Sequence, residues 1–192
     1  MTTKQFLPLP YGKDVYSELK GNGCYFVDKT TYLKELIDKD KSNVMLFTRP
    51  RRFGKTLFMS MVEYFLKINS ANSGDTILQQ KLFKDTKILE DREFCAKYMG
   101  QHPVISLTLK GVQGVDFEDA YYKLAEVVSA KANEYSFLKD SPSLDEKEKA
   151  KFEKLCDEDY LKSFDKRTQS YVTSAIISLA GMLYKHFKKQ VY

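Results

Sequence analysis

Residues 44–58, VMLFTRPRRFGKTLF, are the stretch that decides the fold. An apolar run ends at Thr48, a short basic loop follows, and apolar residues recur at helical spacing from Leu57 onward. A buried strand, a tight loop and a helix in this order are typical of a phosphate-binding loop (Walker A), whose general form is G-x-x-x-x-G-K-[ST]. Gly54-Lys55-Thr56 matches the second half of that motif.

The residue types of this loop suit the binding of phosphate groups. Gly54 lets the backbone come close to a phosphate without a Cβ atom in the way. The amides of the loop and of the first helical turn point at the anion, and the helix dipole favours negative charge there. Lys55 would reach the outer phosphates of ATP, and Thr56 would place its hydroxyl on Mg²⁺. The pattern therefore predicts ATP and Mg²⁺ as cofactors, with Thr56 as the metal ligand.

One position departs from the general motif, because its first glycine falls at Arg49 and the loop reads RPRRFGKT. Basic and aromatic side chains together also hold single-stranded nucleic acid, so a nucleic-acid-binding module is an alternative. A third interpretation is that Arg49 narrows the cradle and that the loop serves only protein interaction. The residues predicted to bind nucleotide are Arg49, Arg51, Arg52, Phe53, Gly54, Lys55 and Thr56.

The composition is that of an ordinary soluble globular chain. Of 192 residues, 43% are hydrophobic and 30% are charged. The 31 Lys and Arg residues exceed the 26 Asp and Glu residues by 5, a mildly basic balance that suits polyanions without by itself indicating nucleic-acid binding. The apolar runs are too short to cross a bilayer, and the N-terminus lacks an apolar segment of signal-peptide length. We therefore expect a cytoplasmic protein without membrane contact.

Metal-binding and nucleophilic arrangements are not indicated. The three cysteines are far apart and odd in number, so they suggest neither a zinc site nor a disulfide framework. His102 and His186 have no Cys, Asp or Glu residues at ligand spacing. No catalytic residue is therefore assigned.

The remaining pattern predicts an α/β fold of the P-loop NTPase type, with an incomplete parallel sheet flanked by helices. Residues 24–27 and 104–109 have the composition of strands. Asp116 is expected to cap a long helix, and the charged stretch 144–164 to seat a surface helix. Helical spacing predicts helices over residues 13–20, 30–38, 55–68, 76–83, 90–98, 116–135 and 170–188.

The acidic residue that such an enzyme needs after a second buried strand (Walker B) is missing. No run of four apolar residues followed by Asp or Glu occurs after Thr56. The apolar run that closes on Asp28 precedes the loop, so we expect Asp28 to have a local structural role. Residues 190–192 begin to read as a strand. Whether the chain is an enzyme therefore stays open.

These residues resemble the N-terminal part of the bacterial AAA-ATPase-like family, whose members often carry a restriction-endonuclease-like nuclease domain after the ATPase part. Arg49, which departs from the general motif, fits the family's version of the loop. The resemblance covers essentially the whole chain and implies ATP binding by Gly54, Lys55 and Thr56. The matching segments are GCYFVDKT (23–30), YLKELI (32–37), FTRPRRFGKT (47–56) and PVISL (103–107).

The resemblance also implies an organisation. Residues 1–192 would form the N-terminal part of one AAA-ATPase-like domain, with an arm and helices in 1–43, a P-loop core in 44–135 and a helical segment in 136–192. In such proteins a strand ending in an Asp-Glu pair follows a helix like that at 170–188, so we expect a truncated chain with unpaired sheet edges. Such a chain should be marginally stable or self-associate, and its hydrolysis of ATP should be very slow.

Overall fold

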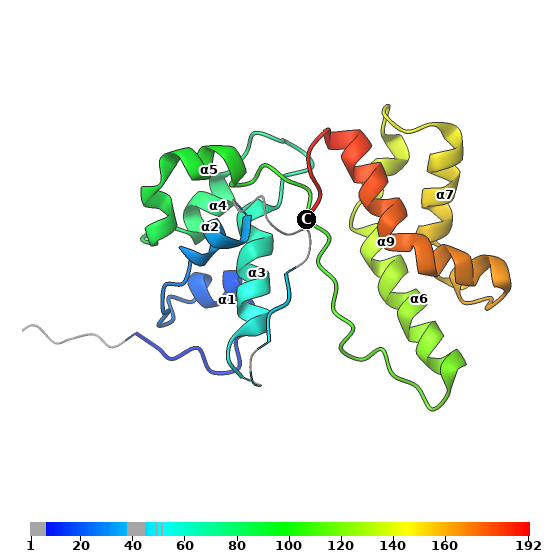
Figure 1. The fold of residues 1–192 in the computed structure, drawn as a ribbon, viewed down its shortest axis with the longest axis horizontal. Helices are drawn as coiled ribbons and strands as arrows, with labels where there is room; N and C mark the ends of the chain where they lie inside the picture. Colours follow the sequence, from blue (N-terminus) through cyan, green and yellow to red (C-terminus); the bar gives the residue numbers. More distant parts are fainter. Residues whose placement is uncertain (1–6, 38–44, 49, 51) are drawn as a thin grey trace, which may run out of the picture. The chain divides into compact units, whose positions relative to one another are not determined.

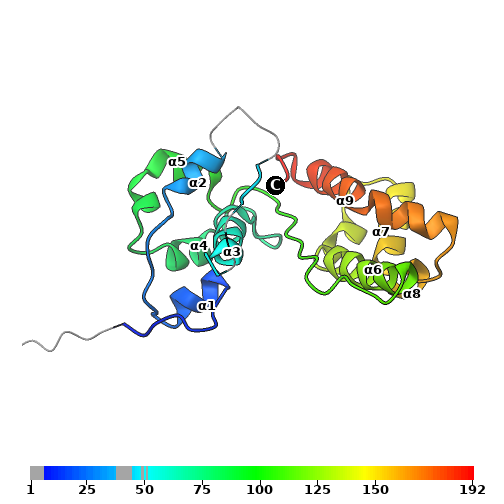
Figure 2. The same cartoon turned by 60° about the horizontal axis from the view of Figure 1, so that its bottom comes forward.

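The computed structural model describes residues 7–37, 45–48, 50 and 52–192. The chain divides into two compact units, Met1–His102 and Pro103–Tyr192, and each is built from helices (Figures 1 and 2). The first unit contains α1 (Tyr16–Gly21), α2 (Tyr32–Ile37), α3 (Lys55–Leu66), α4 (Ile77–Leu82), the 3₁₀ helix η1 (Lys87–Glu90) and α5 (Arg92–Tyr98). The second contains α6 (Phe117–Asn133), the 3₁₀ helix η2 (Ser136–Asp140), α7 (Glu146–Cys156), α8 (Glu158–Leu161) and α9 (Lys166–Phe187).

The predicted α/β fold with an incomplete parallel sheet is wrong for the described part of the chain. None of its residues forms a strand, and the apolar runs at 24–27, 45–48 and 104–109 have no regular structure. An isolated parallel bridge joins Lys67 to His102. The unpaired sheet edges on which the expected self-association rested are likewise not found among these residues. β-branched composition shows only that a segment fits a pleated surface, and a strand also needs a partner to pair with.

The C-terminal residues show how little pairing is formed. The Tyr192 N–H donates to the Pro103 carbonyl (3.0 Å), and the Ile105 N–H donates to the Tyr192 carbonyl (2.7 Å). Both bonds are made by Tyr192, which belongs to the predicted strand at 190–192. One residue that bonds two residues spaced two apart on its neighbour is the pattern of parallel pairing. The run at 104–109 is thus paired at its beginning, whereas Leu107 and Leu109 are exposed.

Aromatic side chains form the core of the first unit around α3. The ring of Phe65, which is fully buried, lies 5.3 Å from the ring of Phe83 and 5.7 Å from that of Phe94. Tyr16 of α1 is also fully buried, with its ring 4.9 Å from that of Phe83. The Tyr16 N–H donates to the Ser60 hydroxyl of α3 (2.8 Å). These contacts fix α3 to the body of the unit.

The second unit is a bundle in which α6 packs against α7, α8 and α9. The predicted Asp116 cap is confirmed, because its carboxylate accepts a hydrogen bond from the Asp119 N–H (2.9 Å). Among the described residues, none of the helices combines the length and the apolar character that a membrane crossing requires. The buried core of the bundle includes Tyr121, Ala125, Leu138, Phe152, Leu155, Leu161, Leu179 and Leu183.

Candidate functional site

The structure describes Pro50 and residues 52–56 of the predicted phosphate loop, whereas Arg49 and Arg51 lie outside the described residues. Arg52 and Gly54 both have left-handed backbone conformations, with φ angles of 65° and 74°. Gly54 stands at the N-cap of α3, where its carbonyl accepts a hydrogen bond from the Phe58 N–H (2.9 Å). The predicted helix therefore begins where the motif requires it. The exposed residues of this turn are Arg52, Phe53, Gly54, Lys55 and Thr56.

The beginning of α3 differs from the beginnings of α5 to α9. Each of α5 to α9 starts after an Asp whose carboxylate accepts a hydrogen bond from a backbone N–H of the first turn. Helix α3 has no side-chain cap and no acidic residue in its first turn. The first amides of a helix have no partner within the helix, so this end suits an external anion.

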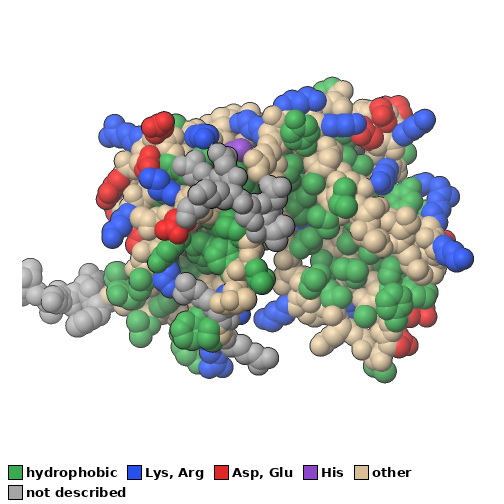
Figure 3. Space-filling model, in the orientation of Figure 1, with side chains coloured by type: hydrophobic (Ala, Val, Ile, Leu, Met, Phe, Trp, Pro, Cys, Tyr) green, Lys and Arg blue, Asp and Glu red, His purple; other side chains and the backbone are tan. Residues whose placement is uncertain are grey.

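A cavity with a volume of about 560 Å³ lies beside Gly54 and Lys55. Its wall is unusually rich in exposed apolar side chains, and hydrophobic side chains gather on the visible face of the first unit (Figure 3). The helical spacing of residues 30–38 and 55–68 gives no sign of this cavity. In the structure Tyr32 is 50% exposed and Phe58 is half-buried. Residues that line the cavity include Tyr32, Glu35, Phe47, Phe53, Phe58 and Met59.

Asp28 has the local structural role predicted for it. Its Oδ1 accepts hydrogen bonds from the Thr30 N–H (2.9 Å) and the Thr30 hydroxyl (2.7 Å), and its Oδ2 accepts one from the Lys87 N–H (2.8 Å). The Thr30 hydroxyl oxygen accepts in turn from the Ile88 N–H (3.2 Å). Partial burial would raise the pKa of Asp28, but these hydrogen bonds outweigh it and hold the pKa below its usual value. The carboxylate ties the segment before α2 to η1.

Replacing Asp28 by asparagine should therefore destabilise the chain by about 1–3 kcal/mol at pH 7, because an amide cannot accept both sets of hydrogen bonds. The folded-state pKa is lower than the unfolded one, so the carboxylate stabilises the fold above the unfolded value of about 4, and this stabilisation is lost as the pH falls below it. Urea unfolding at pH 7 and at about pH 3 measures both effects. Asp14→Asn, at an exposed position, is the control. Equal stability of Asp28→Asn and the wild type at pH 7 would contradict this role.

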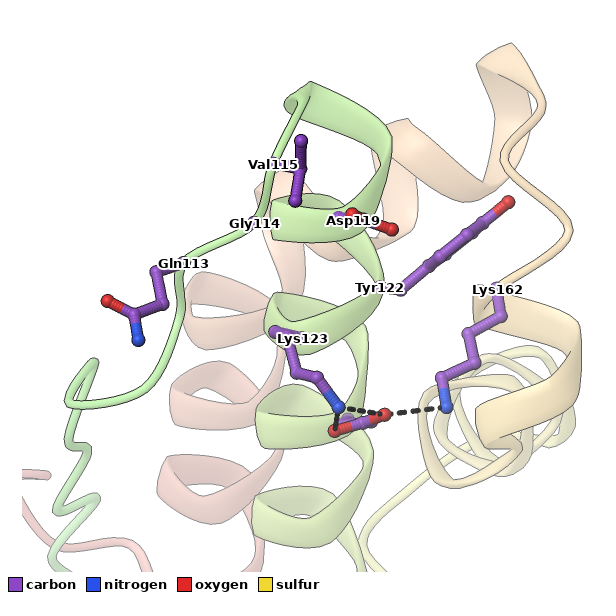
Figure 4. Close-up of a pocket in the computed structure, with 8 residues that line it drawn as sticks. Gln113, Gly114, Val115, Asp119, Tyr122, Lys123 and Lys162 are labelled. Carbon is purple, nitrogen blue, oxygen red and sulfur yellow. Dashed lines mark hydrogen bonds and ion pairs between the residues drawn. The ribbon is translucent and has the colours of Figure 1, made fainter.

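A second cavity, of about 710 Å³, lies beside α6 in the second unit (Figure 4). Three of its charged side chains, Lys123, Glu126 and Lys162, belong to one hydrogen-bonded network. The Lys162 Nζ donates to Glu158 (2.6 Å) and to Glu126 (2.9 Å), and Lys123 donates to the same Glu126 (3.0 Å). These bonds raise the pKa of Lys162, mainly through Glu158, and those from Lys162 and Lys123 lower the pKa of Glu126. The network ties α6 to α8, and it contains no residue of a sequence motif.

The His186 Nδ1 lies 2.7 Å from the Ser141 hydroxyl oxygen, and burial lowers the pKa of this imidazole. Cys24 and Cys95 are buried and form no disulfide. Across the described ranges, no group of three or more His, Cys, Asp or Glu side chains is placed to hold a metal ion.

The chain is similar to known proteins over most of its length. A family whose description is "Predicted AAA-ATPase" matches residues 10–192. The chain is also 26% identical over 122 residues to an "Uncharacterized protein in vnfD 5'region" of Azotobacter chroococcum mcd 1. That match covers 63% of this chain and 20% of the relative, so the chain spans only about a fifth of the relative's length. No solved structure matches the chain. The match over nearly all of its residues shows that the chain belongs to the AAA-ATPase-like family.

Proposed function

We propose that the chain binds ATP together with Mg²⁺ through the loop that precedes α3. The observation that supports this most is the start of α3, where Gly54 stands in a left-handed conformation and no side chain caps the first amides. This end of the helix follows a basic loop, and its first two residues, Lys55 and Thr56, match the Lys-Thr pair of a Walker A motif. Membership of a family described as predicted AAA-ATPases agrees with a nucleotide as the anion.

Each residue of the loop has a role in this proposal. The amides at the start of α3 hydrogen-bond the phosphates, and Lys55 neutralises the outer ones. Arg51 and Arg52 add positive charge to the sequence of the loop, and the Thr56 hydroxyl ligates Mg²⁺. Mg²⁺ usually takes few protein ligands and several phosphate or water oxygens, so a single exposed hydroxyl in the first turn of α3 fits an ion that arrives with the nucleotide. The bound ion would neutralise charge on the phosphates.

We propose nucleotide binding, and not ATP hydrolysis, for the residues described here. An acidic residue at the end of a second apolar run would hold the metal and help to position the attacking water, and none follows Thr56 in the sequence. Hydrolysis by a whole protein of this family, and any nuclease activity beside it, would need groups other than those described above.

Titration calorimetry of the 192-residue chain with ATP and Mg²⁺ tests the proposal. Saturable binding with one nucleotide per chain is expected. If a single-stranded oligonucleotide binds as well, ATP should displace it when the two share the loop. Absence of ATP binding by a chain that binds the oligonucleotide would favour the nucleic-acid interpretation of the basic loop. An oligonucleotide that ATP binds beside but fails to displace would be bound elsewhere on the chain.

The left-handed conformation of Gly54 gives a further prediction. A Cβ atom at this position would meet no atom within 4 Å, so Gly54→Ala should cost only backbone strain, about 1 kcal/mol of folding free energy. The added methyl group stands where the phosphates would approach the backbone, so ATP affinity should fall by roughly tenfold or more. Calorimetry and urea unfolding measure the two effects.

Gly12→Ala is the matched control for this variant. Gly12 also has a positive φ angle (71°), and a Cβ atom there also meets open space. It should show the same loss of stability with unchanged ATP affinity. ATP binding by Gly54→Ala at the wild-type level would contradict a close approach of phosphate to Gly54.

A further inference from the structure

The cavity beside the phosphate loop has the size and composition of a ligand site. Its volume of about 560 Å³ lies within the usual range for small-molecule sites, roughly 300–1,000 Å³. Most of its lining residues come from three segments: α2, residues 45–48, and residues 53–59 at the start of α3. Gly54 and Lys55 form part of the same wall. A molecule whose phosphates lie at the start of α3 would therefore reach this cavity with its other end.

Large apolar side chains face this cavity without being buried. Tyr32 is 50% exposed, Phe47 43% and Phe53 59%. The rings of Phe47 and Phe58 lie 5.4 Å apart with their planes 55° apart, so they form one continuous aromatic wall. Adjacent exposed apolar side chains of this size commonly mark a binding site. Rings with open faces are also the groups on which nucleic-acid bases stack.

Two charged residues complete the lining. Lys29 and Glu35 are both exposed, and both line the cavity with the aromatic side chains. A carboxylate accepts hydrogen bonds only, so Glu35 suits the amino group on the edge of a base. An apolar cavity with a few polar groups at its wall is the usual arrangement of a site that orients a flat ligand.

We infer that this cavity binds the base of the nucleotide whose phosphates lie at the loop. The base stacks against the exposed rings of Tyr32 and Phe53, and Glu35 accepts a hydrogen bond from an amino group of the base. A purine should be preferred to a pyrimidine, because its two fused rings offer a larger face for stacking. This inference rests on the proposed function, since the loop must first hold the phosphates.

Calorimetry with two ligands separates the base site from the phosphate site. The ligands are ATP and inorganic tripolyphosphate, each with Mg²⁺. Tyr32→Ala and Phe53→Ala should each lower the affinity for ATP about tenfold and leave the affinity for tripolyphosphate unchanged. Lys55→Ala should lower both affinities. Tyr32→Phe keeps the ring and should bind ATP as the wild type does. Tyr184→Ala, at a position 56% exposed on α9, is the matched control and should change neither affinity.

The possible outcomes distinguish this inference from the function on which it rests. If Lys55→Ala loses ATP while Tyr32→Ala and Phe53→Ala keep it, the base site is overturned and the phosphate loop stands. If these two variants lose ATP and tripolyphosphate equally, the rings only support the loop, and the base site is again overturned. If the wild type binds neither ligand, both proposals fall.

Photolabelling of the wild-type chain adds a test that needs no variant. With 8-azido-ATP as the probe, the label should be found on peptides containing residues 29–36 or 53–59, and unlabelled ATP should prevent the labelling. A label found elsewhere and equally prevented by ATP would overturn the inference.

Discussion

Replacing Lys55 by alanine is expected to lower the affinity of the chain for ATP and Mg²⁺ about 100-fold, which corresponds to roughly 3 kcal/mol. The ammonium group carries three donors, and each hydrogen bond that it makes to a charged group contributes about 1.5–3 kcal/mol. Removing the side chain leaves the loop amides and the helix dipole to hold the phosphates. Lys55 is exposed in the first turn of α3, so the loss should appear in binding and not in folding.

The measurement is a parallel titration of wild type, Lys55→Ala and Lys81→Ala with ATP and Mg²⁺. Lys81 is an exposed lysine in the last turn of α4, and its removal changes the net charge equally. A thermal or urea unfolding series with ATP gives a second readout, because a ligand at 100 times its dissociation constant stabilises the wild type by about 2.7 kcal/mol. If Lys55→Ala and Lys81→Ala lost affinity for ATP equally, the loss would reflect net charge alone. That result would contradict phosphate binding by the loop.

The helices of this chain could be predicted because their signals are local. The stripe of Met61, Val62, Phe65 and Leu66 was expected from spacing alone, and these side chains are buried on α3. The cap at Asp116 was likewise evident from one residue and the pattern after it. The ends of the helices predicted from spacing lie within a few residues of the observed ends, which is the usual uncertainty of such boundaries.

The sheet was predicted wrongly because pairing is not a local property. Residues 104–109 have strand composition, yet only the beginning of this run is paired, through the Tyr192 bonds to Pro103 and Ile105. Hydrogen-bonding partners decide whether an apolar run becomes a strand, and composition does not report them. A phosphate-loop motif commonly occurs beside a parallel sheet, and the sheet was expected here for that reason. The residues of this chain do not themselves specify it.

Because sequence patterns report local features, they predicted the turn and helix start at the candidate site but not the cavity beside them. The turn at Gly54 and the start of α3 follow from contiguous residues, so the motif located them correctly. The cavity beside them is lined by Tyr32 and Phe53, which are separated by 21 positions in the chain and line one cavity only in the folded unit. Helical spacing places Tyr32 in a helix but gives no sign of the cavity, because periodicity cannot tell a core side chain from one that lines a cavity.

Replacing Phe65 by alanine is expected to have the largest effect on stability, a loss of about 3–5 kcal/mol. The side chain is fully buried and lies between the rings of Phe83 and Phe94, so its removal leaves a cavity at the centre of the first unit. Proteins of this kind have a total stability of about 5–15 kcal/mol, so the loss is a large part of the whole. Phe65 also anchors α3, and its removal should weaken ATP binding by reducing the fraction of chains in which the loop is formed.

Urea unfolding followed by circular dichroism measures this loss, with Phe117→Ala as the control. Phe117 is 72% exposed at the start of α6, so its removal should change the stability by no more than about 0.5 kcal/mol. Saturating ATP should restore part of the stability of Phe65→Ala, because the ligand binds only the folded unit. A Phe65→Ala chain as stable as Phe117→Ala would contradict an aromatic core around α3. A destabilised chain that ATP fails to rescue would instead show that α3 and its loop do not form the nucleotide site.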